Sequence, residues 1–419
     1  MNFNPGDFVK LRLSDRELEC TILESHDAGI VLVKLDSGYN IGVPREHILD
    51  SILIRKFEGK VNRIEEIRNK KGLPTIGLIV TGGTIASKLD ARTGGVAPLK
   101  TEEDFRKVYP ELFKIANVKI EIPFSMLSEN MTSDEWISLA ECVKKMLDDN
   151  EIEGVIVSHG TDTLHYTSAA LSFFLGKLNK PVVLTYSQRS IDRASSDADL
   201  NLRCSAKFAL SDCAEVVIVG HAGMNDDFCY ALSGAKTRKM HSSRRDAFKS
   251  INTSAIAKIF TDRIEFLSSF NARSKNKNEL DAIFSDKIVL FHYYPGQKPD
   301  ILEYYSLKGI KGIVIAGTGM GHVPTIGKNS WIPVIKKLTK AGFFVCMTTQ
   351  TFYGRVDGHV YSTGRDLLEA GVVFLEDMLP ETAFVKLGWV LGHRSWKTPE
   401  KIKEKMLENF AGEFSKILV

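Results

Sequence analysis

Hydrophobic and polar positions follow two different patterns along the chain. Up to about residue 70, short runs such as residues 8–13 alternate between apolar and polar side chains over much of their length, which is typical of strands with one buried face. After Pro74, continuous apolar runs such as residues 76–80 alternate with helical stretches. Such runs indicate strands buried on both faces, as in a parallel sheet covered by helices. The change predicts a small β domain followed by an α/β body.

Residues 1–70 are expected to form a small antiparallel β-barrel of the SH3-like type, because several short strand patterns follow one another at close spacing. These strand patterns cover residues 8–13, 18–23, 30–35 and 41–43, with a turn cluster at 36–40. Barrels of this kind bind RNA, bind peptides or bind nothing, so a docking or spacer module is an equally good interpretation. Residues 69–74 are predicted to be a mostly polar linker.

The body is expected to comprise two α/β domains, at residues 74–272 and 285–419. A polar and charged stretch at about 271–286 is predicted to link them. A helix is expected to begin after an N-cap at Thr132 or Ser133, and another near residues 193–202. The predicted strands cover residues 76–80, 155–158, 182–185 and 214–219 in the first domain, and 288–291, 313–316 and 343–347 in the second.

Composition narrows the class of protein without identifying it. The 419 residues are 43% hydrophobic and 26% charged, with a net charge of +3, so bulk charge does not call for a nucleic-acid partner. None of the six cysteines forms a C-x-x-C pair or has histidines at zinc spacing, which favours free thiols in a reducing compartment. We find no signal-peptide pattern and no apolar run of transmembrane length, and therefore expect a cytoplasmic protein without a membrane partner.

The first candidate for chemistry follows the run at residues 76–80. It reads Thr81-Gly82-Gly83-Thr84-Ile85-Ala86-Ser87. The two glycines allow a sharp turn and leave room for another group to approach closely. The Thr84 hydroxyl is therefore expected just beyond the carboxyl end of a strand, where open α/β sheets bind ligands.

A second stretch has the same construction. The run at residues 155–158 is followed by His159-Gly160-Thr161-Asp162-Thr163. Two parallel strands that end side by side would bring Thr84, Thr161 and Asp162 to one edge. Two hydroxyls and a carboxylate suit nucleophilic acyl transfer, in which one threonine attacks and the other groups help to move its proton. Either motif alone is usually just a turn. Both motifs together, each directly after an apolar run, are a far more specific sign of function.

The two motifs resemble the paired signatures of the bacterial-type L-asparaginase/glutaminase family, and the resemblance extends from about residue 73 to the end. It implies a two-domain body with parallel sheets, and catalytic roles for Thr84, Thr161 and Asp162. It also implies that Lys239 is the catalytic lysine, because small polar residues and Phe248 follow it. Lys207 and Lys236 are rivals without these flanking residues, and the basic cluster could otherwise be a solvated face.

The resemblance also suggests which groups hold the substrate. Ser128 matches the position that binds the substrate's α-amino and α-carboxylate groups, Glu129 is a usable acceptor for an ammonium, and Asp162 is a further candidate. Without the family, Ser128 and Glu129 would be interpreted as a capping pair. Backbone N–H groups around Gly83 and Gly160 are candidates for the oxyanion hole. The Gly-rich residues 88–96 are expected to be a mobile lid or an ordinary connection.

Cofactor chemistry is not expected on this chain. It contains no G-x-x-x-x-G-K-[ST] phosphate loop and no metal-ligand constellation, so we expect no bound metal and no bound cofactor. Residues 317–322 resemble a dinucleotide loop, but His322 occupies the place of the third glycine. If Lys239 contacts Asp162, each favours the charged form of the other, so Lys239 would orient Thr161 more than it would abstract a proton. The sequence does not decide which threonine attacks first.

Two details narrow the resemblance to one branch of the family. The β domain before the first motif, and residues 375–393, resemble the asparaginase-like component of archaeal glutamyl-tRNA(Gln) amidotransferases. This implies that glutamine hydrolysis supplies ammonia to convert Glu-tRNA(Gln) to Gln-tRNA(Gln). It also implies a partner, the E subunit of the same amidotransferase, that activates the glutamyl group with ATP and Mg, and a homodimeric assembly.

Two other functions stay open. A stand-alone L-asparaginase with an appended barrel would lack the partner, and an RNA-binding or scaffolding protein would have kept the fold without activity. The barrel and the stretch at 375–393 favour the amidotransferase over the first alternative. The intact set of Thr84, Thr161, Asp162 and Lys239 argues against the second.

Overall fold

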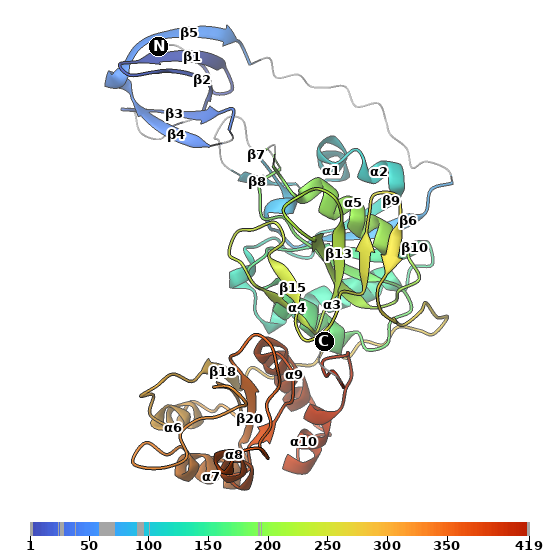
Figure 1. Cartoon of the computed structure of the whole chain (residues 1–419). Helices are drawn as coiled ribbons and strands as arrows, with labels where there is room; N and C mark the ends of the chain where they lie inside the picture. Colours follow the sequence, from blue (N-terminus) through green and yellow to red (C-terminus); the bar gives the residue numbers. More distant parts are fainter. Residues whose placement is uncertain are drawn as a thin grey trace.

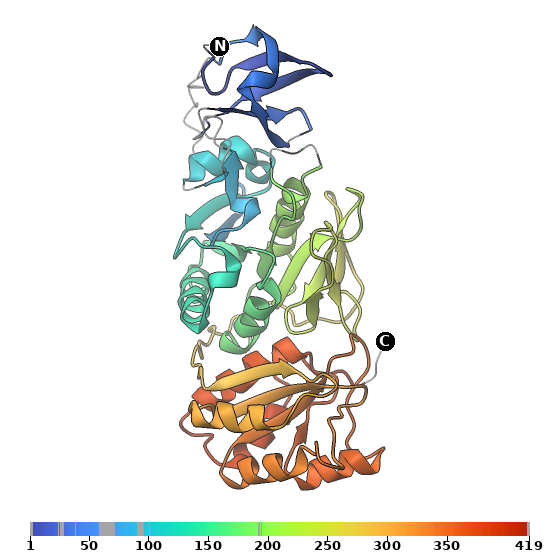
Figure 2. The ribbon, with the colours of Figure 1, turned by 90° about the vertical axis from the view of Figure 1, so that its left-hand side faces the viewer.

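The computed structural model describes residues 3–23, 25, 29–37, 39–57, 72–89, 96–99, 101–191, 193 and 195–416. Figures 1 and 2 show three parts that follow one another along the chain, namely a β domain, a central α/β body and a C-terminal α/β unit. Residues 69–71 of the linker predicted at 69–74 lie outside the described residues. No helix among the described residues is long and apolar enough to cross a membrane.

The N-terminal part is a five-stranded antiparallel sheet with the order β4-β3-β2-β1-β5. Its core is formed by alternate residues, among them Val9 and Leu11 of one strand and Val31 and Val33 of another. The expected antiparallel β domain is therefore confirmed. Its strands are β1 (Phe8–Leu13), β2 (Glu17–Ile22), β3 (Ile30–Leu35), β4 (Asn40–Pro44) and β5 (Ile48–Arg55), with a single 3₁₀ turn at Arg45–His47.

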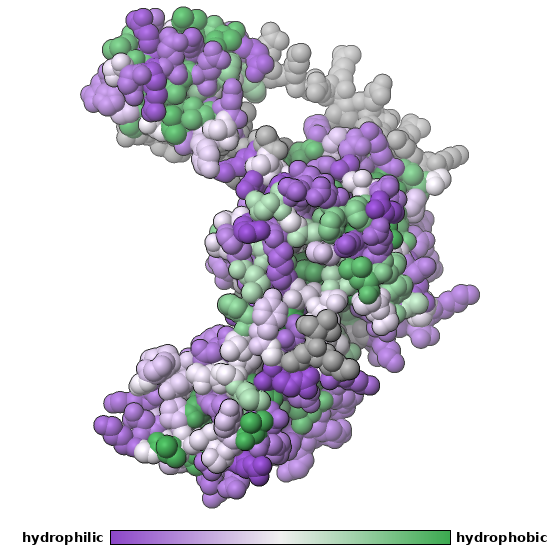
Figure 3. All heavy atoms as spheres, viewed as in Figure 1, coloured by the Kyte–Doolittle hydropathy of each residue, from purple (hydrophilic) through white to green (hydrophobic). Residues whose placement is uncertain are grey.

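Strand β5 was not predicted, because its apolar residues do not alternate with a buried face. It lies at the end of the sheet next to β1, and its side chains Leu49, Ile52, Leu53 and Ile54 are exposed. Figure 3 shows hydrophobic and hydrophilic residues mixed on the visible surface of this domain.

The central body contains an eight-stranded sheet with the order β17-β16-β13-β12-β11-β10-β6-β9. The five strands from β9 to β12 in this order are parallel, as expected, whereas β13, β16 and β17 add an antiparallel extension. The expected parallel sheet of the body is therefore confirmed, and the antiparallel strands extend it at one end. The strands are β6 (Thr75–Val80), β9 (Asn117–Glu121), β10 (Ile152–Ser158), β11 (Val182–Thr185), β12 (Val216–His221), β13 (Cys229–Ser233), β16 (Ala257–Ile259) and β17 (Ile264–Phe266).

Helices cover both faces of this sheet, because successive residues of a strand point to opposite sides. Ile156 packs toward one face with α1, α2 and α5, while Val155 and Val157 pack toward α3 and α4. Thr132 is the N-cap of α3 and forms a capping box with Glu135. The helices are α1 (Glu102–Val108), α2 (Leu112–Ile115), α3 (Ser133–Leu147), α4 (Leu164–Phe174) and α5 (Ala198–Ala209).

Two small hairpins accompany the body. Strands β7 (Ser87–Leu89) and β8 (Val96–Pro98) pair antiparallel, as do β14 (Thr237–Lys239) and β15 (Phe248–Ser250). The predicted lid at 88–96 overlaps the first hairpin. Its residues 90–95 lie outside the described part of the chain.

The C-terminal unit is a four-stranded parallel sheet with the order β18-β19-β20-β21. Ile313 and Ile315 face α6, α7 and α8 on one side, and Val314 faces α9 on the other. Its elements are β18 (Ile288–His292), α6 (Asp300–Leu307), β19 (Gly312–Gly317), α7 (Ile332–Lys340), β20 (Phe344–Thr349), α8 (Ser362–Glu369), β21 (Val373–Phe374), α9 (Pro380–Gly392) and α10 (Pro399–Leu407).

Helix α9 packs against α4 of the body, so one hydrophobic cluster continues from the central sheet into the C-terminal unit. The segment predicted to link the two units crosses this junction. Phe284 contacts Trp136 edge-on at a ring-centroid distance of 5.6 Å and Phe174 at 6.3 Å. The segment is therefore packed into the interface between the units.

Candidate active site

The two loops predicted to carry chemistry meet at the carboxyl ends of neighbouring parallel strands. Val80 of β6 pairs with Ser158 of β10, and the Thr81 hydroxyl donates to the Ser158 carbonyl oxygen at 2.8 Å. A Cβ atom at Gly83 would lie 2.8 Å from the backbone nitrogen of Gly160. Gly83 also has a φ of +81°, which L side chains rarely adopt. Glycine is therefore required where the loops touch.

Thr84 begins a 3₁₀ turn, Thr84–Ala86, directly after this contact. The turn is closed by a hydrogen bond from Ala86 N to Gly83 O at 3.1 Å. Ile85 is fully buried, and its carbonyl oxygen accepts a 2.6 Å hydrogen bond from the Tyr109 hydroxyl. The turn is anchored from the core side, while Thr84 itself is only half-buried.

Lys239 connects two residues of the second loop. Its Nζ lies 2.8 Å from the Thr161 hydroxyl and 2.8 Å from Oδ1 of Asp162. The lysine side chain is 12% exposed and that of Asp162 62%, so the pair lies at the boundary between the body and solvent. The structure thus brings three of the four predicted catalytic side chains into direct contact.

The two rival lysines lie elsewhere. Lys207 donates to the Asp262 carbonyl oxygen at 2.8 Å. Lys236 is buried and pairs with Asp377 of the C-terminal unit. Neither of these contacts involves the two loops.

Ser128 is placed beside the second loop, in a short turn at Ser128–Asn130. It is buried, and a Cβ atom at Gly160 would lie 2.8 Å from its Oγ. Its carbonyl oxygen accepts a 2.7 Å hydrogen bond from the Thr163 hydroxyl, which fixes the turn to the loop. Glu129, in contrast, is exposed. Sequence reasoning gave Thr163 no role, although its place in the same motif as Thr161 was a usable signal.

Two buried histidines at the second loop have pKa values well below the ordinary value of a histidine. Burial lowers the pKa of His159 to about 4, against the opposing effect of a hydrogen bond to the Gly160 carbonyl oxygen at 2.7 Å. Burial, with smaller contributions from Arg238 and Lys239, lowers the pKa of His165 to about 3. Because a carbonyl oxygen only accepts, Nδ1 of His159 carries the proton of the neutral ring.

The site therefore combines two threonine loops, a carboxylate and a lysine. Such a set can supply a hydroxyl nucleophile, a donor that orients a second hydroxyl, and backbone N–H groups near a developing oxyanion. Among the described residues, no group of three or more His, Cys, Asp or Glu side chains is arranged to hold a metal ion.

Comparison with known families divides the chain into three matched segments. Residues 75–271 match the family described as Asparaginase, N-terminal, and residues 287–406 match the Glutaminase/Asparaginase C-terminal domain. Residues 3–53 match the GatD N-terminal domain.

Curated relatives match over nearly the whole chain. The D subunit of the glutamyl-tRNA(Gln) amidotransferase of Pyrococcus furiosus is 48% identical, covering 98% of this chain and 94% of its own length. The D subunit of the Archaeoglobus fulgidus amidotransferase is 44% identical, with coverages of 97% and 94%.

Solved structures of L-asparaginases have a similar fold. The thermostable L-asparaginase from Thermococcus kodakarensis superposes with a TM-score of 0.72 at 31% identity, covering 81% of this chain and 99% of that one. L-asparaginase I from Vibrio cholerae gives a TM-score of 0.70 at 26% identity, with coverages of 82% and 99%. An asparaginase-type body, a GatD N-terminal domain and these full-length relatives together show that the chain belongs to the family of glutamyl-tRNA(Gln) amidotransferase D subunits.

Proposed function

We propose that this chain hydrolyses the side-chain amide of glutamine and supplies the ammonia for conversion of Glu-tRNA(Gln) to Gln-tRNA(Gln). The observation that carries the proposal is the contact of Lys239 with both Thr161 and Asp162, next to the loop that holds Thr84. The names of the full-length relatives supply the tRNA-dependent context.

In the proposed mechanism, the Thr84 hydroxyl attacks the amide carbon of glutamine. Its proton passes through Thr161 and its neighbours to the leaving nitrogen, so that the C–N bond breaks and ammonia departs. Water then hydrolyses the glutamyl ester and releases glutamate. Lys239 donates to Thr161 and Asp162, which orients the relay and stabilises negative charge as it develops.

The α-ammonium and α-carboxylate groups of the substrate need partners of opposite charge or matching hydrogen-bonding capacity. Glu129 and Asp162 are exposed carboxylates that suit the α-ammonium group. Ser128, held beside Gly160, suits the α-carboxylate. The backbone N–H groups around Gly83 and Gly160 are the proposed donors to the oxyanion.

The ATP-dependent step belongs to another chain in this proposal. The sequence has no phosphate loop of the G-x-x-x-x-G-K-[ST] type, and the relatives are named as one component of an amidotransferase. We therefore propose that the E subunit activates the glutamyl group with ATP and Mg in the cytoplasm, and that this chain binds it as a homodimer.

The test is ammonia release from glutamine and from asparagine, measured for the purified chain alone and together with the E subunit, ATP and Glu-tRNA(Gln). We expect glutamine hydrolysis that rises when the partner and charged tRNA are present. Thr84→Ala should lower ammonia release by about 10³-fold or more, because the nucleophile is lost, while the circular dichroism spectrum stays unchanged. Full turnover in this variant, with loss in Thr161→Ala, would move the nucleophile to Thr161.

A stand-alone asparaginase would give a different result. Fast asparagine hydrolysis that ignores both partner and tRNA would contradict the proposed function and leave the N-terminal β domain without a role in the reaction.

A further inference from the structure

The strand that carries Lys239 is held from its other side by the C-terminal unit. Side chains alternate along β14, so Lys239 and Arg238 point in opposite directions. Lys239 reaches Thr161, whereas Nε of Arg238 lies 3.0 Å from Oε1 of Glu381 at the start of α9. The Arg238–Glu381 ion pair therefore lies on the face of β14 opposite to Lys239.

Two further contacts hold the residues just before Arg238. Lys236 forms an ion pair with Asp377, and both side chains are almost fully buried. The Thr382 hydroxyl donates to the Ala235 carbonyl oxygen at 2.9 Å. We call Asp377, Glu381 and Thr382 the β14 anchor, because all three bind the segment 235–238 immediately ahead of Lys239.

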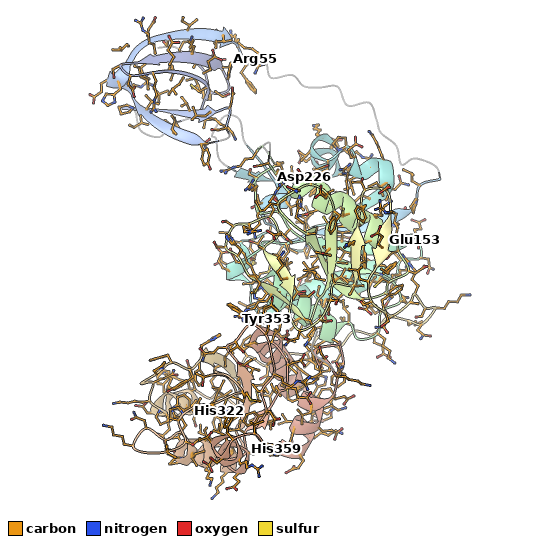
Figure 4. The ribbon with its side chains drawn as sticks, viewed as in Figure 1. Arg55, Glu153, Asp226, His322, Tyr353 and His359 are labelled. Atoms are coloured by element: carbon orange, nitrogen blue, oxygen red, sulfur yellow. The ribbon has the colours of Figure 1, made fainter. Side chains whose placement is uncertain are left out.

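The anchor is continuous with contacts at the far end of the hairpin. Asn252, two residues beyond β15, exchanges hydrogen bonds with the backbone of Gly354 at 2.8 and 3.0 Å. The neighbouring Phe352 ring lies 5.3 Å from the Arg238 guanidinium carbon. Figure 4 shows Tyr353, which lies between Phe352 and Gly354 in the sequence, at the junction of the body and the C-terminal unit.

A contribution to the stability of the fold does not explain the anchor well. Removing two charges from water costs several kcal/mol, so a buried ion pair contributes little net stability. Here Oε2 of Glu381 and Nη1 of Arg238 are buried without a partner among the described residues. Burial also lowers the pKa of Lys236 from its ordinary value, although Asp377 opposes this shift. What the pairs do fix is the position of β14 relative to α9.

We propose that the β14 anchor positions Lys239 against Thr161, so that the C-terminal unit sets the geometry of the catalytic relay in the central body. The inference rests on the proposed function for the role of Lys239, but not for the contacts themselves. Asp377, Glu381 and Thr382 are positioning residues, since they act on the site only through β14.

The test compares Glu381→Gln and Thr382→Val with Glu413→Gln as a matched control. Glu413 pairs with Lys386, also on α9, at 2.6 Å in a fully buried setting, and Lys386 donates its hydrogen bonds to residues 406–413 rather than to the segment 235–238. Thr382→Val keeps the side-chain shape, so it remains informative if Glu381→Gln folds poorly. Each variant is assayed in the complex with the E subunit for glutamine-dependent ammonia release, and by mass spectrometry for the rate at which Lys239 is acetylated.

We expect Glu381→Gln and Thr382→Val to lower kcat by about tenfold to a hundredfold with KM unchanged, because a displacement of about 1 Å is enough for such a loss. Lys239 should become acetylated several-fold faster relative to Lys258 in the same sample. Glu413→Gln should lower the melting temperature and leave both readouts as in the wild type.

The inference is overturned if the folded Glu381→Gln and Thr382→Val proteins keep the wild-type kcat and acetylation rate, or if Glu413→Gln changes both to the same extent. Failure of the proposed function is distinguishable, because it would show in the wild-type protein as fast asparagine hydrolysis that is independent of the E subunit and of charged tRNA. The acetylation rate would then still decide whether the anchor holds Lys239.

Discussion

The central body and the C-terminal unit both carry a glycine-rich loop at the carboxyl end of a parallel strand, but the threonine hydroxyls of the two loops have different partners: Thr161 binds Lys239 of another element, whereas Thr318 binds a carbonyl oxygen of its own loop. In the body, the loop after β6 touches the loop after β10, and Lys239 from a third element contacts the latter. In the C-terminal unit, the loop after β19 closes on itself. The backbone N of Thr318 donates to His322 O at 3.0 Å, and His322 N donates to Thr318 O at 2.9 Å.

This difference shows what a loop at the end of a strand needs in order to become a site. The polar groups of Thr318 and His322 bond to each other within the loop, and the Thr318 hydroxyl also donates to His322 O at 3.1 Å. His322 lies in the C-terminal unit (Figure 4), with its ring edge-on to Tyr361. In the body, the glycines instead place two backbones in contact, and the Thr161 hydroxyl binds Lys239 from another element.

The largest effect is expected from removing Lys239, which binds the second loop of the body. Lys239→Met should lower kcat for glutamine hydrolysis by about 10²–10⁴-fold, the usual cost of losing a group that assists proton transfer. Thr318→Ala, the corresponding change in the closed loop, should leave kcat unchanged. Steady-state ammonia release measures both, and equal losses in the two variants would remove the distinction between the loops.

A smaller effect is expected from a methyl group at the glycines. Gly83→Ala places a Cβ 2.8 Å from backbone atoms of the second loop, so we expect kcat to fall about tenfold or more, together with a lower melting temperature. Gly319→Ala has open space around its Cβ and a φ of +49°. It should cost about 1–2 kcal/mol of stability from the backbone alone and spare activity. An active Gly83→Ala protein would show that the loop contact is not needed.

The smallest effect concerns the pH dependence of stability near the site. The pKa of His159 is lowered to about 4 in the folded state, from an ordinary value of 6.5. The unfolded chain therefore binds more protons between these values, so the free energy of unfolding falls as pH decreases from about 6.5 toward 4. The contribution is at most about 1.4 kcal/mol per pH unit.

Urea unfolding of His159→Gln between pH 4 and 7 checks this prediction. The slope of the unfolding free energy against pH should become shallower, although His165 keeps part of it, because its pKa is lowered in the same direction. Replacing the exposed His292 is the control and should leave the slope as in the wild type. An unchanged slope in His159→Gln would contradict the neutral, buried state of this ring.

Local sequence patterns were enough to place most of the parallel strands and both threonine loops. The apolar runs at 76–80 and 155–158 are continuous because both faces of β6 and β10 are covered by helices. Adjacent parallel strands must end at the same edge, so the loops that carry Thr84 and Thr161 could be placed together from these patterns alone. The short strands β13, β16 and β17 were missed, since three to five residues give too little periodicity.

Which residues from distant parts of the sequence contact these loops depends on how the folded chain packs. Lys239 lies on a three-residue strand with no apolar pattern, and only the family resemblance selected it over Lys207 and Lys236. Its anchor, Glu381, is even further along the chain and meets β14 because α9 packs against α4. Alternation of side chains is a property of each segment, whereas charge pairing across the junction depends on how whole helices and sheets pack.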